Sequence, residues 1–407
     1  MKRSTYRRSL ARPLVGVLVL GGVLAVAGST GAQVTGRCSN CHTMHNSQDA
    51  SPMTLNESAT PNPMLTRGDC MGCHASGTNQ KMWNIDGVTF IPQVFHTDAS
   101  GDLAGGNFAY INDTKAGGIG DGDNRGHNVI DIFGPGSDDN LSVVPGGILQ
   151  YYHDQNVTDL TLTCAGENGC HGERVWNSGV TGLAALKGAH HGNTDGACNP
   201  PLDNPTVGDS YRFLLGVKGY ENQTSGQKWQ NVSASSHNEY FGQAVPNVMH
   251  CSGGTGSCHF PGGPIRPRNQ TISGFCGTCH GNFHTLKPPT SDGSESSDGQ
   301  SMGIGPAVTS PFRRHPTDIV INRLGAGSEY SQYTTYNVNA PVGRTTVLSA
   351  PSAVVTPASD TVTCLSCHMV HASPYPDMLR WNYDALQAHS GSNTNGCFIC
   401  HTTKDDV

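Results

Sequence analysis

The chain is short of the side chains that normally fill a protein core. Of its 407 residues, 35% are hydrophobic, 7% aromatic and 14% charged, whereas glycine occurs 52 times. No long segment shows a sustained helical or alternating apolar period. A chain of this length could bury a sizeable core, but this one supplies few side chains for it. Either much of the chain is disordered, or something other than side chains occupies its interior.

Long apolar runs are scarce too. The apolar run over 14–27 follows five basic residues and precedes small residues around Ala32, a pattern that predicts a secretory signal over 1–32. The run is short for a membrane span, and a retained N-terminal anchor is the alternative. Beyond it no apolar stretch reaches spanning length. We therefore expect an exported mature chain over 33–407 that forms a single domain without a transmembrane span.

Positive charge is also in short supply. The formal net charge is -7, and removal of the predicted signal, which holds five basic residues and no acidic one, takes it to -12. A strongly acidic protein repels phosphate backbones, so nucleic acid is excluded as a natural partner.

Cysteine and histidine, in contrast, are abundant. Ten of the 15 cysteines fall in five copies of C-x-x-C-H, which begin at Cys38, Cys70, Cys276, Cys364 and Cys397. This is the spacing of c-type haem attachment, in which two thioether bonds hold the haem edge and the following histidine turns its imidazole onto the iron. Disulfides are the usual use of cysteine in exported chains, but they do not explain the repeated histidine. Structural zinc does not require it either and is disfavoured.

Two further cysteine pairs carry longer insertions. Five residues separate Cys164 from Cys170, six separate Cys251 from Cys258, and a histidine follows each pair. Both insertions are rich in residues suited to tight, irregular backbone. Because the Cys-His adjacency matters more than the gap, we interpret both as stretched haem motifs, with a local disulfide and an incidental histidine as the alternative. Cys198 is then left as a buried thiol or an unassigned partner.

The seven motifs together define the predicted cofactor, seven c-type haems. The attachment residues are Cys38, Cys41, Cys70, Cys73, Cys164, Cys170, Cys251, Cys258, Cys276, Cys279, Cys364, Cys367, Cys397 and Cys400. The proximal iron ligands are His42, His74, His171, His259, His280, His368 and His401.

Twelve of the 19 histidines remain to supply the second axial ligands. Three of them, His45, His284 and His371, follow a proximal histidine by three or four residues. On a helical turn they project to the same side as that histidine, so each is placed to bind a neighbouring haem. The distal candidates are His45, His96, His127, His190, His191, His237, His284, His315 and His371, and the histidines expected to be structural are His153, His250 and His389. Methionine ligation is disfavoured because histidine is plentiful.

Coarse patterning adds a few expected elements. Short helices are expected over 181–190 and 377–389, and short strands over 317–322 and 345–355. The polar run 290–300 is expected to be a surface loop.

Several segments resemble the outer-surface multihaem cytochromes of metal-reducing bacteria, particularly the filament-forming OmcS type. They are CSNCHTMHNS from Cys38, GHN from Gly126, FCGTCHGNFH from Phe275, RHP from Arg314 and CLSCHMVHASPYPDMLRWN from Cys364. The resemblance implies a multihaem cytochrome c fold, mostly coil and turns with short helices and few short strands, wrapped around a chain of haems. It also implies a homopolymer in which His45 ligates a haem of the next subunit, the one held by Cys364, Cys367 and His368. The two stretched motifs depart from that type.

The expected function is long-range electron transfer through about seven closely packed bis-histidine haems, as a subunit of an extracellular conducting filament that serves extracellular respiration. Other redox proteins or extracellular metal oxides are the expected partners, at the cell surface or outside it. Periplasmic location as a soluble shuttle is one alternative. A multihaem oxyanion reductase is another, disfavoured because it needs an open iron and all seven motifs end in histidine.

We expect the intact mass of the mature protein to correspond to cleavage after Ala32 and the addition of seven haems. A mass with five haems would show that the two longer cysteine pairs do not bind haem.

Overall fold

A computed structural model describes residues 36–47, 51–55, 57–75, 79–99, 101–115, 117–118, 122–134, 144–145, 162–172, 174, 178–186, 214, 216–219, 231–243, 271–280, 315, 317–322, 325–346, 348, 350–391 and 395–404. Several expectations lie outside these residues: the signal over 1–32, the second stretched motif at Cys251, Cys258 and His259, Cys198, the loop 290–300, and the histidines His153, His190, His191, His250 and His284.

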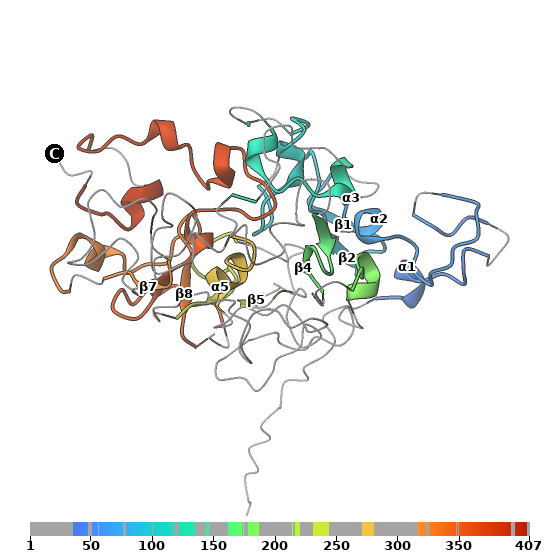
Figure 1. Cartoon of the computed structure of the whole chain (residues 1–407), viewed down its shortest axis with the longest axis horizontal. Coiled ribbons are helices and arrows are strands. Elements are labelled where there is room, and N and C mark those ends of the chain that lie inside the picture. Colours follow the sequence, from blue (N-terminus) through green and yellow to red (C-terminus); the bar gives the residue numbers. More distant parts are fainter. Residues whose placement is uncertain are drawn as a thin grey trace, which may run out of the picture. The chain divides into compact units, whose positions relative to one another are not determined.

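Regular structure in the described chain is short everywhere (Figure 1). The α-helices are α1 (Cys38–Cys41), α2 (Cys70–His74), α3 (Ile130–Phe133) and α5 (Ile272–Cys276). The 3-10 turns are η2 (Phe108–Tyr110), η3 (Asp123–Arg125), η5 (Gly182–Ala185), η9 (Glu329–Gln332), η10 (Cys364–Ser366), η11 (Pro376–Met378), η12 (Tyr383–Ala385) and η13 (Gly396–Ile399). The predicted fold class, mostly coil with short helices and few short strands, is confirmed. No helix among the described residues is both long and apolar enough to cross a membrane.

Five of the helical turns, α1, α2, α5, η10 and η13, overlap attachment motifs, and side-chain caps start several of them. The Asp69 side chain accepts a hydrogen bond from the Gly72 amide at 2.6 Å at the start of α2. Thr271 caps α5 in the same way, and Thr363 forms a capping box with Ser366 at η10. Each cap satisfies amide groups that a helix leaves unpaired at its start. A single capped turn brings cysteines three residues apart to one side.

The strands form three small sheets. β1 (Met82–Asn84) is antiparallel to β2 (Phe90–Pro92), and β3 (Thr163–Ala165) is parallel to β4 (Gly169–His171). The third sheet has five strands in the order β5-β6-β8-β9-β7. They are β5 (Val217–Lys218), β6 (Glu239–Phe241), β8 (Val342–Arg344), β9 (Thr361–Val362) and β7 (Ile319–Val320), antiparallel except for the β6–β8 pair.

The expected elements are only partly present. β7 lies within the strand expected over 317–322, but the strand expected over 345–355 is wrong. The sheet strand β8 ends at Arg344, because the chain then turns back and offers the Val354 carbonyl to the Arg344 guanidinium at 2.7 Å. In 181–190 the described part holds only η5. In 377–389 it holds only short turns, because Asp377 and Met378 adopt positive φ angles that no α-helix tolerates.

Buried apolar residues form separate small clusters. One packs on the five-stranded sheet and contains Ile321, Tyr333, Tyr336, Ala340, Val342, Val355, Val362 and Ile399. Another contains Phe108, Tyr110, Ile111, Val129 and Ala372. The low apolar content of the chain therefore supports several local cores.

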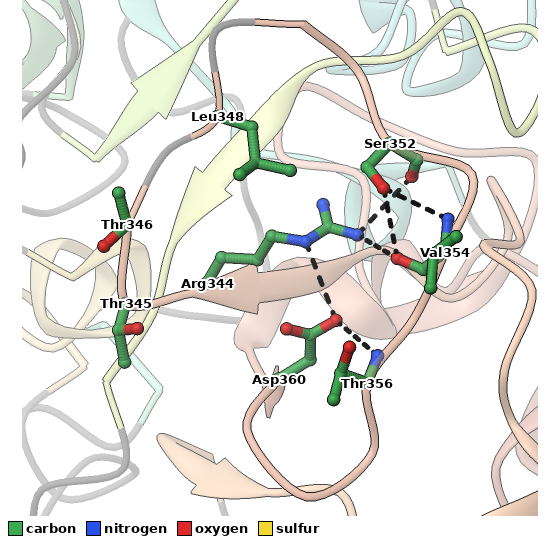
Figure 2. A pocket seen from close by; sticks show the side chains of 8 residues that line it. All are labelled: Arg344, Thr345, Thr346, Leu348, Ser352, Val354, Thr356 and Asp360. Carbon is green, nitrogen blue, oxygen red and sulfur yellow. Dashed lines mark hydrogen bonds and ion pairs between the residues drawn. The ribbon is translucent and has the colours of Figure 1, made fainter.

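A buried charged network ties β6 to β8. The fully buried Glu239 carboxylate accepts hydrogen bonds from the Arg344 guanidinium and, at 2.9 Å, from the Ser352 amide. Figure 2 shows Arg344 beside Asp360, whose carboxylate lies 3.6 Å from the Arg344 Nε. A charge buried this deeply is stable only while it stays paired.

We expect Glu239→Ala to lower the free energy of unfolding by about 3–5 kcal/mol, because it leaves the Arg344 charge buried without its nearest partner. Denaturant titration of the purified holoprotein measures the change. The exposed Glu57 provides the control, and Glu57→Ala should change stability by less than about 0.5 kcal/mol. Equal midpoints for the two variants would contradict the role given to Glu239.

Candidate haem-binding site

Four of the motif histidines share one hydrogen-bonding arrangement. The Nδ1 atoms of His42, His74, His280 and His368 lie 3.2, 2.8, 2.7 and 2.7 Å from the carbonyl oxygens of Leu65, Pro92, Pro145 and Asp377, respectively. A carbonyl only accepts, so Nδ1 carries the proton and Nε2 keeps its lone pair. Metal-bound histidines almost always donate their second nitrogen in this way. The motif histidines therefore fit iron ligation through Nε2.

Burial holds three of these imidazoles, those of His74, His280 and His368, in the neutral form. Loss of solvent lowers the pKa of His74 and of His368, and it lowers the pKa of His280 to about 4. Only a neutral imidazole binds a metal. At neutral pH these rings are thus in the protonation state that ligation requires.

Three motif histidines face a predicted distal histidine. The ring centroids of His127 and His280 are 6.0 Å apart. The corresponding distance is 6.2 Å both for His171 with His371 and for His315 with His401. Two imidazoles bound on opposite sides of one metal, each through a bond of about 2.0 Å, have centroids about 6 Å apart. The spacing of all three pairs therefore fits a single iron between the rings.

The His171–His371 pair involves the stretched motif at Cys164 and Cys170. These cysteines lie in the paired strands β3 and β4, and both are free thiols. The turn between them passes close to another segment: a Cβ at Gly166, whose φ is +102°, would lie 2.2 Å from the Val180 carbonyl oxygen. The five-residue insertion is thus a compact strand-turn-strand unit that presents both cysteines.

His45 is held in place but faces solvent. Its Nδ1 lies 3.0 Å from the Asn62 carbonyl, and its backbone has a positive φ of 56°. The next side chain, Asn46, donates to the carbonyls of Ser58 and Thr60, which folds the following loop back onto this segment. This role of Asn46 is not among the expectations from the sequence. The signal that points to it is its position as a polar residue beside a haem motif. The loop therefore holds the exposed His45 imidazole in place, with its Nδ1 hydrogen-bonded to a main-chain carbonyl.

Two other distal candidates have different surroundings. His96 is buried, neither of its ring nitrogens makes a hydrogen bond, and burial lowers its pKa to about 4. His237 has both ring nitrogens occupied: Nδ1 is 3.3 Å from the Ser233 carbonyl and Nε2 is 3.1 Å from Glu239. Its ring also stacks on Tyr336 at 3.6 Å. His237 offers no free nitrogen to a metal in this arrangement, and its role as a ligand stays a prediction.

Successive attachment motifs lie beside one another. Burial raises the pKa of Cys73 to about 12, and the neighbouring Cys41 adds to that rise. A hydrogen bond with Cys364 is the main cause of the raised pKa of Cys276. A nearby cysteine of another motif also helps to raise the pKa of Cys164, Cys170 and Cys400. The respective neighbours are Cys70, Cys279 and Cys367. The six motifs in the described chain thus form one continuous series in sequence order.

Comparison with known proteins agrees with this site. A family model described as the doubled CXXCH motif matches residues 356–406. The C-type cytochrome OmcS of Geobacter sulfurreducens is 25% identical over 370 residues, which cover 85% of this chain and 78% of the relative. The chain is homologous to OmcS.

Two solved structures were also matched. They are the outer membrane cytochrome S filament from Geobacter sulfurreducens, with 17% identity and a TM-score of 0.37, and the OmcS nanowires from the same organism, with 19% identity and a TM-score of 0.38. Each match covers 93% of this chain, and 92% and 95% of the respective structure.

We expect His371→Ala to leave the iron bound by His171 without its second ligand. One haem then becomes high-spin in the ferric state, which the optical and electron paramagnetic resonance spectra of the purified protein detect. His389→Ala removes an exposed histidine expected to be structural, and its spectra should match the wild type. A His371→Ala protein in which every haem stays low-spin would contradict the pairing.

Proposed function

We propose that this chain carries electrons over long distances through about seven closely packed c-type haems, each held between two histidines, as a subunit of an extracellular conducting filament. The observation that carries the proposal is the set of three proximal–distal histidine pairs with centroids 6.0–6.2 Å apart. Homology to a C-type cytochrome supports the same cofactor.

The residues of the chain hold, orient and enclose the cofactors. Cysteine pairs supply the thioether bonds, and main-chain carbonyls fix the tautomer of the ligating histidines. Haem iron supplies one-electron exchange between its ferric and ferrous states. Histidines on both sides leave no axial position for a substrate, so the proposed role is electron transfer and not an enzymatic reaction on a bound substrate.

The number of haems rests on two kinds of support. Five motifs have the regular spacing, and the stretched motif at Cys164 is supported by the His171–His371 pair. The stretched motif at Cys251 and Cys258 rests on the sequence alone. Ligation by the other distal candidates is likewise part of the proposal.

Assembly into a filament is supported by the homology to OmcS and by the surface around His45. The solved structures of OmcS are those of a filament and of nanowires. Around the exposed His45 lie three large apolar side chains with high exposed fractions: Met44 at 64%, Leu65 at 50% and Met64 at 41%. Exposed apolar residues gathered in one place are typical of interfaces. We propose that this surface contacts a second copy of the chain, and that His45 ligates the haem held by His368 in that copy.

The proposed location follows from the same assignment. A chain processed after Ala32 into one mature domain over 33–407 is exported and acts at the cell surface, where other redox proteins or metal oxides exchange electrons with it.

We expect His45→Ala to yield folded monomers that do not polymerise and that contain one high-spin haem. Electron cryo-microscopy of material sheared from cells, together with the ferric spectrum, measures both effects. Ser51→Ala, an exposed change in the same loop, serves as the control and should leave filaments intact.

Normal filaments from His45→Ala would contradict the proposal that His45 ligates a haem in a second copy of the chain. Wild-type material that contains only discrete particles would instead favour a soluble electron shuttle.

A further inference from the structure

Two of the four arginines that are buried in the described part of the chain have carboxylate partners. Arg125 forms an ion pair with Asp113, and Arg344 forms one with Glu239. Arg174 is also buried, with 4% of its surface exposed, but it has no ion pair with a carboxylate in the described part of the chain. Because a buried charge is normally paired, an arginine without such a partner at a cofactor site points to a role for its charge.

The fourth buried arginine, Arg380, provides a useful contrast. Its Nε donates to the Leu365 carbonyl at 2.7 Å, and its Nη1 lies 3.4 Å from the Val338 carbonyl. The Arg380 side chain thus contacts main-chain groups. Arg174 instead contacts the side chains of another haem motif.

The Arg174 guanidinium lies between two attachment motifs. Arg174 itself follows the stretched motif by three residues. Its Nη1 donates to the Thr278 hydroxyl at 2.8 Å, and its Nη2 is 3.5 Å from the Cys279 sulfur, both in the motif that begins at Cys276. The guanidinium also lies over the Phe275 ring at 5.1 Å. The Nε of Arg174 makes no hydrogen bond although it is buried.

Arg174 follows His171 by only three residues, and β4 (Gly169–His171) carries both Cys170 and His171. Arg174 is therefore close in the chain to one motif, while its guanidinium contacts the other.

A buried cation at this position has a predictable effect on electron transfer. A ferric iron with a porphyrin and two neutral imidazoles carries one net positive charge, and the ferrous form carries none. A nearby cation therefore disfavours the ferric form, and the effect is strong where little water screens it. Charge and solvent exposure around a haem are known determinants of its potential.

On the basis of the proposed function, we infer that Arg174 is a potential-setting residue, which raises the reduction potentials of the two haems attached at Cys164–Cys170 and Cys276–Cys279. These two haems then hold an electron more readily than the other haems of the chain.

A redox titration of purified holoprotein, followed by optical and electron paramagnetic resonance spectra, tests this inference. In Arg174→Gln, two haem components should shift to lower potential, with the ferric-to-ferrous ratio at a fixed potential rising about tenfold. For a one-electron couple, that change equals about 59 mV. Arg174→Lys keeps the charge and should retain most of the wild-type potential.

Lys404→Gln is the control, because it removes an exposed cation that follows a different motif and whose charge water screens. It should leave these two potentials unchanged. A second route keeps Arg174 in place: Thr278→Asp puts a carboxylate beside the guanidinium and should lower the same two potentials.

An Arg174→Gln protein with a full haem complement and unchanged potentials would overturn the inference, because the charge of Arg174 would then have no effect on either haem. If Arg174→Gln does not assemble, unchanged potentials in Thr278→Asp would have the same meaning. The proposed function is tested separately by the intact mass of the wild-type protein. A mass without the expected haems would contradict that function, whatever the result for Arg174.

Discussion

The hydrogen bond from a histidine Nδ1 to a main-chain carbonyl is the interaction on which this structure depends. It fixes the tautomer and the plane of the ring, and it leaves Nε2 free for a metal. The same bond occurs at motif histidines such as His74 and His368 and at the distal candidate His127, whose Nδ1 lies 2.7 Å from the Val370 carbonyl. Acceptors of this kind have to be left over by regular structure: Pro92 is the last residue of β2, Asp377 lies in the single turn η11, and Val370 lies outside the helices and strands.

This requirement accounts for the coil-rich fold. A long helix uses its carbonyls internally, and a sheet uses them between strands. A chain that must supply acceptors to many imidazoles keeps irregular backbone, with single helical turns only where a cysteine motif needs them. The five-stranded sheet lies where the described chain has its largest apolar cluster and its buried Glu239–Arg344 pair. Ordinary packing and cofactor binding partly share segments, because this cluster includes Ile399 of the motif that begins at Cys397.

The sequence was informative about chemistry and much less so about partners. The motif spacing predicted haem c, which the homology to a C-type cytochrome supports, because three-residue spacing is a local property of the sequence. The carbonyl acceptors could not be predicted, since His42 uses Leu65 and His280 uses Pro145, far away along the chain.

Long-range contacts also bear on the expected strand and on His237. No described residue of 345–355 lies in a strand, and the Arg344 guanidinium binds the Val354 carbonyl there. The sequence pattern of His237 resembles that of the other distal candidates, but its Nε2 lies 3.1 Å from Glu239, which is itself paired with Arg344. Ligation by His237 stays a prediction. The Glu239–Arg344 pair joins residues 105 apart in the sequence and takes part in both cases, and local patterns carry no information about it.

The glycine content follows from the same physical requirement. At Gly105 an added Cβ would lie 2.9 Å from the His371 Nδ1, so the main chain passes the imidazole closer than any side chain allows. The Gly105 carbonyl also accepts the His371 amide hydrogen at 2.6 Å, which anchors this histidine through its own backbone. Irregular backbone that must approach rigid rings closely needs residues without a Cβ. A composition with few apolar residues and many glycines is therefore what a chain requires when it is built around planar cofactors and the histidines that hold them.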